Sequence, residues 1–263
     1  MTKEHKNYLK KIRNRKILII SLRVGILALF IGLWELLSHY EVIDPFIFSS
    51  PSRICKLIIK LTKESDLSMH VWTSFYETVI GFVAATFLGT LIAILLWCST
   101  TLKDVMEPYL ITLNSLPKIA LGPIIIVWMG TGQKSIIFMA ILICIIITII
   151  SMLTGFNSVE NEKIMLMKSM RANKFQLLTK LVLPANIPNL ISVLKINVGL
   201  SWIGSIMGEY LSSQKGLGYL LVYGSQVFQL DLVMASTVIL CVLAGLMYVA
   251  VALLEKIVKK HFD

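Results

Sequence analysis

Six apolar stretches, each long enough to cross a lipid bilayer, constrain this chain more than any other feature of its sequence. A transmembrane helix needs about 20 consecutive, mostly apolar residues. The 263-residue chain is 56% hydrophobic and only 15% charged, whereas a soluble domain is typically about 45–50% apolar and about 25% charged. This composition excludes an ordinary soluble enzyme and predicts an all-α integral membrane protein. The stretches cover residues 17–37, 73–97, 104–129, 134–152, 188–211 and 232–254.

The first stretch follows a basic tail and is predicted to stay in the protein. It is too long for the apolar region of a signal peptide, and no small-residue cleavage site follows it. We therefore expect a cytoplasmic tail over residues 1–16, a first transmembrane helix over 17–38 and an external connection over 39–72. A core of five further helices over 73–255 would carry a cytoplasmic loop at about 156–187, and residues 256–263 would form a second cytoplasmic tail.

The positions of the basic residues predict the orientation of the chain in the membrane. The formal net charge is +10, from 25 Lys and Arg against 15 Asp and Glu. If both termini are cytoplasmic, 16 of the 25 basic residues lie on inside segments, six on outside segments and three within the stretches. Cytoplasmic loops of membrane proteins are enriched in Lys and Arg. The basic excess thus indicates orientation and gives no support to nucleic acid as a partner.

No arrangement of residues in the sequence predicts a metal site or a catalytic centre. The four cysteines form no CxxC pair, and the four histidines are isolated from one another. The sequence contains no Walker A motif, no Ser-His-Asp set and no paired carboxylates. We expect no cofactor and no enzymatic activity in this chain.

Two long connections carry helical signals. In the external one, Ser49-Ser50-Pro51-Ser52 has the capping residues and the proline that begin a helix. Apolar residues at helical spacing follow, so we expect an amphipathic helix at the outer surface; they are Ile54, Leu57, Ile58 and Leu61. The cytoplasmic connection, residues 155–187, has two helical halves that flank a polar bend. This connection either lies on the membrane surface and orients the spans, or provides a docking site for another protein.

Small and polar residues mark particular faces of the spans. Gly81, Ala85, Gly89 and Ala93 recur every four residues, which predicts close helix packing in lipid. The third stretch carries Lys118 among prolines at mid-depth, so Lys118 either faces a water-filled pathway or lies at an interface beside a re-entrant turn. In the fifth, a polar stripe either makes hydrogen-bonded helix contacts or lines a pathway; it consists of Asn197, Ser201, Ser205 and Glu209.

The cytoplasmic loop resembles the EAA loop of the permease subunits of bacterial ABC importers, in the branch that serves sulfonates, taurine and nitrate. Ala172, Phe175, Leu178 and Leu183-Pro184 stand at positions that match the family pattern. The Glu-Ala-Ala of the family is replaced by Met165-Leu166-Met167, and its glycine by Arg171. An arginine there must either accept the strain of a positive-φ turn or adopt a different bend.

Other segments resemble the same family in the expected order, from about residue 34 to residue 254. They are Trp34-Glu35, Ser50-Pro51-Ser52, Leu116-Pro117-Lys118-Ile119-Ala120-Leu121-Gly122-Pro123, Trp128-Met129-Gly130-Thr131-Gly132, Gly208-Glu209, Gly216-Leu217-Gly218-Tyr219-Leu220 and Tyr223-Gly224-Ser225-Gln226-Val227-Phe228-Gln229-Leu230-Asp231.

The resemblance implies a type I ABC importer architecture (MetI-like), with six transmembrane helices and an EAA-type coupling helix at about Met165–Asn173. It implies a permease homodimer in the lipid of a bacterial cell membrane, two docked ATPase subunits and an extracytoplasmic solute-binding protein. The solute would be a sulfonate, taurine, nitrate, bicarbonate or a pyrimidine precursor. Contacts to the ATPase would come from Met165, Lys168, Arg171, Ala172, Asn173, Lys174 and Phe175, and the candidate pathway residues are Lys118, Asn197, Ser201, Ser205 and Glu209.

Two other function classes remain as alternatives. A stand-alone secondary transporter or channel would fit the six spans, but no inverted repeat is visible and the intramembrane charges are few. A membrane-embedded transferase would need acidic or histidine clusters at the membrane face, which the sequence lacks.

Overall fold

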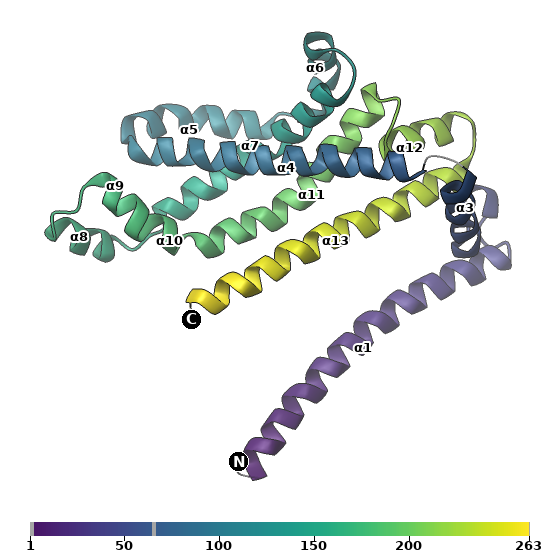
Figure 1. Ribbon diagram of the computed structural model, residues 1–263, viewed down its shortest axis with the longest axis horizontal. Helices are drawn as coiled ribbons and strands as arrows, with labels where there is room; N and C mark the ends of the chain where they lie inside the picture. The colour runs from purple at the N-terminus through teal and green to yellow at the C-terminus, as the bar shows by residue number, and fades with distance from the viewer. Residues whose placement is uncertain (1–2, 65–66, 263) are drawn as a thin grey trace. The chain divides into compact units, whose positions relative to one another are not determined.

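The computed structural model describes residues 3–64 and 67–262, and every regular element in these ranges is helical (Figure 1). The chain forms two compact units, residues 1–65 with 224–235 and residues 66–223 with 236–263. Within the described ranges, five helices are long and apolar enough to cross a membrane, and a bent pair of shorter helices gives up to six spans. The predicted all-α membrane architecture is therefore confirmed.

The first unit begins with α1 (Lys3–His39), in which the basic tail and the first apolar stretch form one continuous helix. The short α2 (Pro45–Phe48) and the amphipathic α3 (Pro51–Glu64) follow. The predicted start of α3 is confirmed: Pro51 is its first residue, and the Ser50 hydroxyl accepts the Arg53 N–H at 3.3 Å. Glu35 of α1 accepts a further N–H of this first turn, from Ser52, at 3.0 Å. Such acceptors satisfy the free N–H groups at a helix start.

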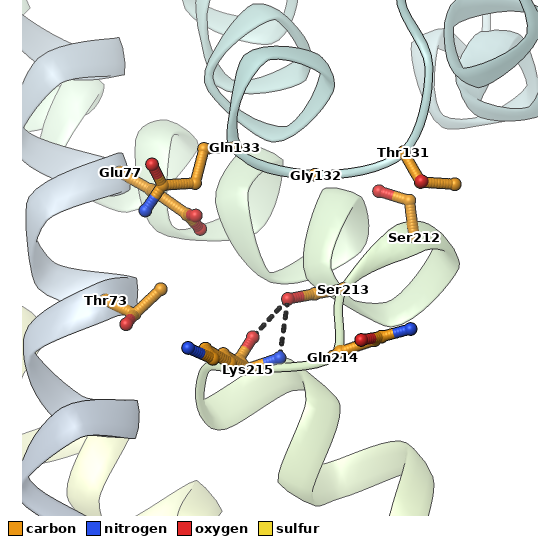
Figure 2. A pocket seen from close by; sticks show the side chains of 9 residues that line it. All are labelled: Thr73, Glu77, Thr131, Gly132, Gln133, Ser212, Ser213, Gln214 and Lys215. Atoms are coloured by element: carbon orange, nitrogen blue, oxygen red, sulfur yellow. Dashed lines mark hydrogen bonds between the residues drawn. The ribbon is translucent and has the colours of Figure 1, made fainter.

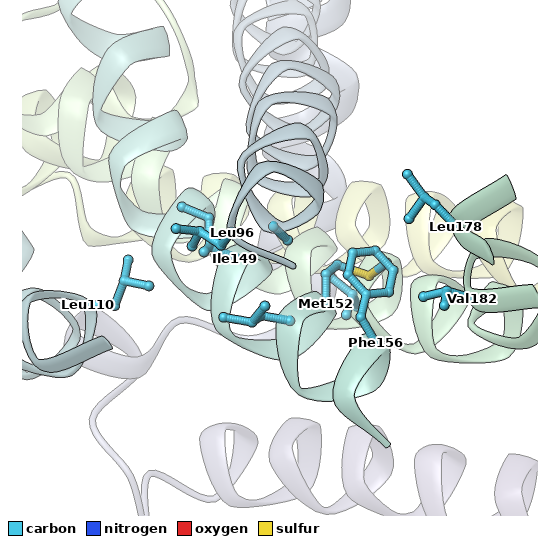
Figure 3. Packing of buried hydrophobic residues seen from close by; sticks show 10 residues of the cluster. Leu96, Leu110, Ile149, Met152, Phe156, Leu178 and Val182 are labelled. Atoms are coloured by element: carbon cyan, nitrogen blue, oxygen red, sulfur yellow. The ribbon is translucent and has the colours of Figure 1, made fainter. Parts of the chain in front are cut away.

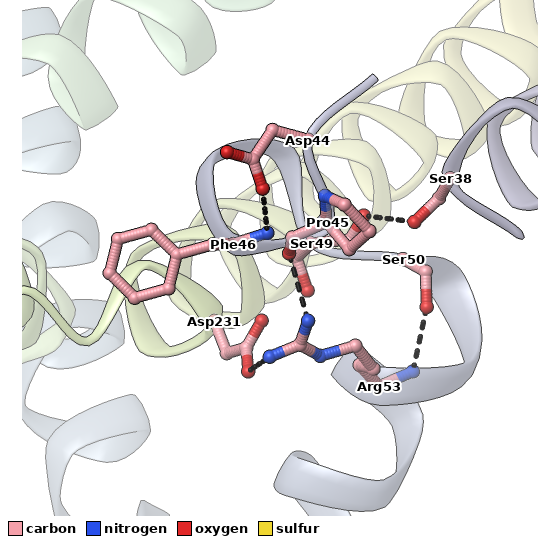
Figure 4. Close-up of polar contacts among 8 residues, drawn as sticks. All are labelled: Ser38, Asp44, Pro45, Phe46, Ser49, Ser50, Arg53 and Asp231. Carbon is pink, nitrogen blue, oxygen red and sulfur yellow. Dashed lines mark hydrogen bonds and ion pairs between the residues drawn. The ribbon is translucent and has the colours of Figure 1, made fainter. Parts of the chain in front are cut away.

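Arg53 connects three parts of the first unit (Figure 4). Its guanidinium donates to the Pro45 carbonyl at 2.9 Å and forms an ion pair with Asp231 at 2.7 Å. Asp231 lies in the first turn of α13 (Leu230–Phe262). Because both charged groups are partly exposed, this ion pair adds little stability. It does show that the start of α13 lies beside α3 within this unit.

The second unit is built around three helices that pack against one another, α4 (Leu67–Cys98), α7 (Gln133–Asn157) and α11 (Ile187–Ser212) (Figure 1). The predicted packing stripe of α4 is confirmed, because all four of its small residues are buried. A Cβ on Gly81 would lie 2.5 Å from the Ala140 Cβ, and a Cβ on Gly204 would lie 2.5 Å from the Ala140 Cα. Ala140 of α7 therefore lies between a glycine of α4 and a glycine of α11, at a separation that larger side chains would not allow.

The remaining part of α13 packs on the outside of this core. Val198 and Trp202 of α11 form a buried apolar cluster with Met247 and Val251 of α13. Farther along the same two helices, Lys195 and Glu255 form an ion pair at 2.5 Å. The shorter α12 (Leu217–Gln226) connects α11 to α13.

The third predicted span is two helical pieces rather than one straight helix. After α5 (Thr100–Ser115) the chain bends by 86° into a 3₁₀ turn, η1 (Lys118–Leu121), and then α6 (Gly122–Met129). Leu116 is extended (φ −68°, ψ 137°) directly before Pro117, because a residue that precedes proline disfavours the helical conformation. The break therefore falls at Pro117, whereas the earlier Pro108 lies inside α5 without ending it.

Candidate functional site

The connection between α7 and α11, which the sequence predicts to be cytoplasmic, folds as a helical turn whose tip presents apolar and basic side chains to solvent. It contains α8 (Asn161–Ser169), a turn over residues 170–173, and α9 (Lys174–Leu177). The predicted coupling helix at Met165–Asn173 is wrong in its bounds, because the helix ends at Ser169. The predicted ATPase-contacting residues all lie on this segment, and Ala172 alone among them is half-buried; the exposed ones are Met165, Lys168, Arg171, Asn173, Lys174 and Phe175.

The turn between α8 and α9 is fixed by Arg171 and Asn173. Arg171 has a φ of 59°, in the left-handed region. Of the two alternatives that the sequence allows at this position, the arginine therefore adopts the strained positive-φ turn. Asn173 then begins α9 with a reciprocal cap: its side chain accepts the Gln176 N–H at 2.8 Å, and its own N–H donates to the Gln176 side chain at 3.0 Å. This capping box defines where the second helix starts.

Replacing Arg171 by glycine is expected to stabilise this turn. A non-glycine residue in the left-handed region costs roughly 1–2 kcal/mol, and glycine removes that cost. R171G should therefore slow amide hydrogen exchange over residues 165–176 relative to R171A, which removes the same side chain but keeps the strain. Equal exchange in R171A and R171G would contradict the strained-turn interpretation.

Behind its exposed tip, the loop is anchored in the apolar core at one end of the three-helix bundle. α9 leads into a π-helical turn, η2 (Leu178–Val182), and then α10 (Leu183–Ala185). Leu178 and Val182 are buried in a cluster with Met152 and Phe156 of α7 (Figure 3). The Lys174 ammonium also donates to the Cys98 carbonyl at the end of α4, at 3.3 Å. The loop is therefore in direct contact with α7 and with the end of α4.

The polar stripe of α11 lies in the seam between α11, α4 and α7. Asn197 is fully buried and donates to Thr148 of α7 at 2.8 Å and to Thr86 of α4 at 3.0 Å. Ser205 pairs with Thr78 of α4 at 2.6 Å, and the buried Ser201 bonds within its own helix. The sequence allowed two interpretations of the stripe, helix contacts or a pathway lining. The hydrogen bonds of Asn197 and Ser205 to α4 and α7 correspond to the first.

Glu209, the last residue of the stripe, is buried at the opposite end of the bundle from the α8–α9 turn. It accepts the Gly218 N–H at 2.6 Å. Its carboxyl group lies so close to Gly216, which has a φ of 108°, that a Cβ there would be 2.3 Å from the carboxylate. The same turn is held to α4, because the Leu217 N–H donates to Ser74 at 2.7 Å. Glu209 therefore anchors the turn that begins α12.

Lys118 lies apart from this stripe, in the bend between α5 and α6. Its ammonium donates to the carbonyl of Asn114 at 3.2 Å and to the Asn114 side chain at 3.4 Å. The bond to the carbonyl caps the last turn of α5, where a positive charge is favourable. The structure thus does not bring Lys118 together with the other predicted pathway residues.

A polar cavity of about 560 Å³ lies at the Glu209 end of the bundle (Figure 2). It is lined by Thr73 and Glu77 of α4, by residues 131–133 before and at the start of α7, and by residues 212–215 at the end of α11 and directly after it. Glu77 is fully buried, and its carboxyl group interacts with that of Glu209. Glu77 is not among the predicted pathway residues, although a lone carboxylate inside an otherwise apolar span is a signal of function.

Comparison with known proteins identifies the chain's relatives. Residues 85–263 match the family described as binding-protein-dependent transport system inner membrane component. The taurine transport system permease protein TauC of Escherichia coli is 22% identical over 90% of this chain and 88% of its own length. The formylaminopyrimidine transport permease protein ThiX of Halalkalibacterium halodurans is 29% identical over 86% of this chain and 89% of its own length.

The fold has a solved counterpart. An inward-facing structure of the MetNI methionine ABC transporter superposes with a TM-score of 0.63 at 19% sequence identity, and the match covers 73% of this chain and 94% of the other. At this identity the likeness concerns the fold, and it agrees with the type I importer architecture that the sequence predicts.

Proposed function

The chain belongs to the family of binding-protein-dependent transport system inner membrane components, and from this premise we propose how it transports its solute. It is a multi-pass permease subunit of an ABC importer, a transport component rather than an enzyme. Two copies form the translocation pathway between them. Two ATPase subunits dock on the cytoplasmic side and hydrolyse ATP, and a solute-binding protein delivers the solute from outside.

The observation that carries this proposal is the construction of the α8–α9 turn. Met165 and Phe175 are 70% and 72% exposed, and the exposed basic residues Lys168 and Lys174 lie on the same segment. An exposed apolar patch with charged residues around it is typical of a protein interaction site. Since Leu178 and Val182 fix the segment to α7, closure of the docked ATPases would move the α4–α7–α11 bundle as a rigid body.

The same proposal fixes the orientation in the membrane. The α8–α9 turn is cytoplasmic, as are both termini, and the cavity beside Glu77 and Glu209 opens on the external side. The distribution of the basic residues supports this orientation, because 16 of the 25 lie on the segments that it places inside.

Four of the five predicted pathway residues then divide into two groups. Asn197, Ser201 and Ser205 keep the three helices together while the bundle moves, as their buried contacts suggest. Lys118 is the residue that faces the pathway, because it lies at the bend of the broken span, where exposed backbone requires water or protein partners.

The transported solute is a small polar molecule of the kinds for which the relatives are named. These include taurine and formylaminopyrimidine, and aliphatic sulfonates and nitrate for other relatives. The net charge of the chain does not select an anion, since most of the basic residues are assigned to the cytoplasmic side.

Purification of the affinity-tagged chain from its native membrane tests the proposal. We expect a P-loop ATPase to co-purify in a 1:1 ratio, and we expect it to be lost when the loop is cut between residues 155 and 187. Transport that needs no ATPase and runs on an ion gradient would instead support a secondary transporter.

A further inference from the structure

The cavity at the Glu77 end of the bundle contains carboxylate oxygens that lack hydrogen-bond donors. Glu77 is fully buried, and among the described residues neither of its carboxylate oxygens has a hydrogen-bond partner. One oxygen of Glu209 is also without a donor, while the other accepts the Gly218 N–H. Burying a carboxylate without partners costs several kcal/mol. Apart from the neighbouring carboxyl group of Glu209, the Glu77 carboxyl therefore has no hydrogen-bond donor among the described residues.

The carboxyl groups of Glu77 and Glu209 make the burial of each other's negative charge less favourable. They lie within electrostatic range of one another, and two neighbouring carboxylates in a site of low dielectric repel. In the described part of the chain, Lys215 is the basic residue among those lining the cavity, and no ion pair joins it to either glutamate. A stabilising positive group must therefore come from a proton or from a ligand.

The remaining lining is suited to a polar solute. Gln133 and Gln214 supply neutral donors and acceptors around a space of about 560 Å³, which is within the range of small-molecule sites. Thr73 and Ser212 can add acceptors only, because their hydroxyls donate to carbonyls of their own helices. Carboxylates bind charged N–H donors through short, strong hydrogen bonds. They also repel anions, so the same pair would discriminate against a solute that carries only negative charge.

We propose that this cavity is a solute subsite in which Glu77 binds a cationic or N–H-rich nitrogen group of the transported molecule. This inference rests on the proposed function, since it assigns a role to one end of the translocation pathway. It also narrows the solute class: the transported molecule carries an amino, ammonium or amidine-type group, and a simple nitrate or alkylsulfonate anion is disfavoured. Glu209, held by the Gly216–Gly218 turn, positions Glu77 and contributes negative potential.

The test compares two probes that differ in one group. The complex of the permease with its ATPase is purified in detergent, and its unfolding temperature is measured against 4-amino-2-methylpyrimidine and against 2,4-dimethylpyrimidine, which has a methyl group in place of the amino group, at constant ionic strength. We expect the amino probe to stabilise the wild-type complex and the dimethyl probe, which has no N–H group, to have little effect. Glu77→Gln should weaken the amino probe's apparent affinity by about tenfold or more, since a charge-assisted bond is lost.

The controls separate a ligand site from a merely structural pair. Lys215→Gln, in the same cavity, should leave the response to the amino probe intact or strengthen it. The inference is overturned if wild type responds equally to both probes, or if potassium chloride stabilises as well as the amino probe, which would indicate a simple cation. If the inference fails in this way but the binding protein still stimulates ATP hydrolysis by the complex, the proposed function is still supported.

Discussion

Gly204→Ala should destabilise this protein, whereas Gly199→Ala on the same helix should not. A Cβ at position 204 would lie 2.5 Å from the Ala140 Cα and 3.1 Å from its nitrogen, both backbone atoms that cannot move aside. At position 199 nothing lies within 4 Å. In an open helical position, alanine is favoured over glycine by about 1 kcal/mol, while overpacking typically costs about 1–3 kcal/mol. The two substitutions are therefore expected to have opposite signs.

A double substitution makes this prediction sharper. Gly81→Ala should also destabilise, because its Cβ would meet the Ala140 Cβ at 2.5 Å. Ala140→Gly removes that Cβ and should rescue Gly81→Ala, but it should not rescue Gly204→Ala, where the clash is with backbone. The unfolding temperature of each purified variant is the measurement. Rescue of both variants, or of neither, would show that Ala140 does not lie between the two glycines.

Reversing three charges on the α8–α9 turn should abolish coupling to the ATPase and leave the membrane core folded. Lys168, Arg171 and Lys174 are exposed on the segment proposed to dock, and their replacement by glutamate changes the local charge by six. Truncation of charges at a protein interface typically costs 2–5 kcal/mol each when the pair is buried. We therefore expect at least a hundredfold loss of ATPase binding by the K168E/R171E/K174E variant.

The matched control is the same reversal in the N-terminal tail. Lys10, Lys11 and Arg13 are also exposed and also predicted to be cytoplasmic, but they lie on α1 rather than on the loop. Stimulation of ATP hydrolysis by the binding protein is measured for both variants, and circular dichroism reports their helix content. Intact, coupled hydrolysis in the loop variant would refute the docking assignment.

Most of the fold followed from patterns in the sequence, because each depends on a local physical constraint. The length of an apolar stretch sets the length of a span, and the small-residue stripe from Gly81 to Ala93 is buried as predicted. The serine-proline start of α3 also holds. The bend at Pro117 is a break that the sequence signalled, although its 86° angle depends on packing that the sequence does not display.

The parts that the sequence did not reveal depend on contacts between distant residues. The helix predicted at about Met165–Asn173 extends too far, because the sequence leaves open which bend Arg171 adopts, and its φ of 59° ends the helix before that residue. Glu209 was recognised as part of a stripe, but its contact with Glu77 joins residues more than 130 positions apart. Glu77 is not predicted as a site residue, because its sequence neighbours Tyr76 and Thr78 do not form a known motif with it.

ATP-driven uptake by the reconstituted complex tests the central claim most directly. The permease, its ATPase and its binding protein are placed in vesicles, and accumulation of labelled solute is followed with ATP supplied on the ATPase side. Our account predicts uptake that requires all three components and stops when the ATPase is replaced by a variant unable to hydrolyse ATP. Equal uptake by the permease alone, driven by an ion gradient and indifferent to ATP, would contradict it.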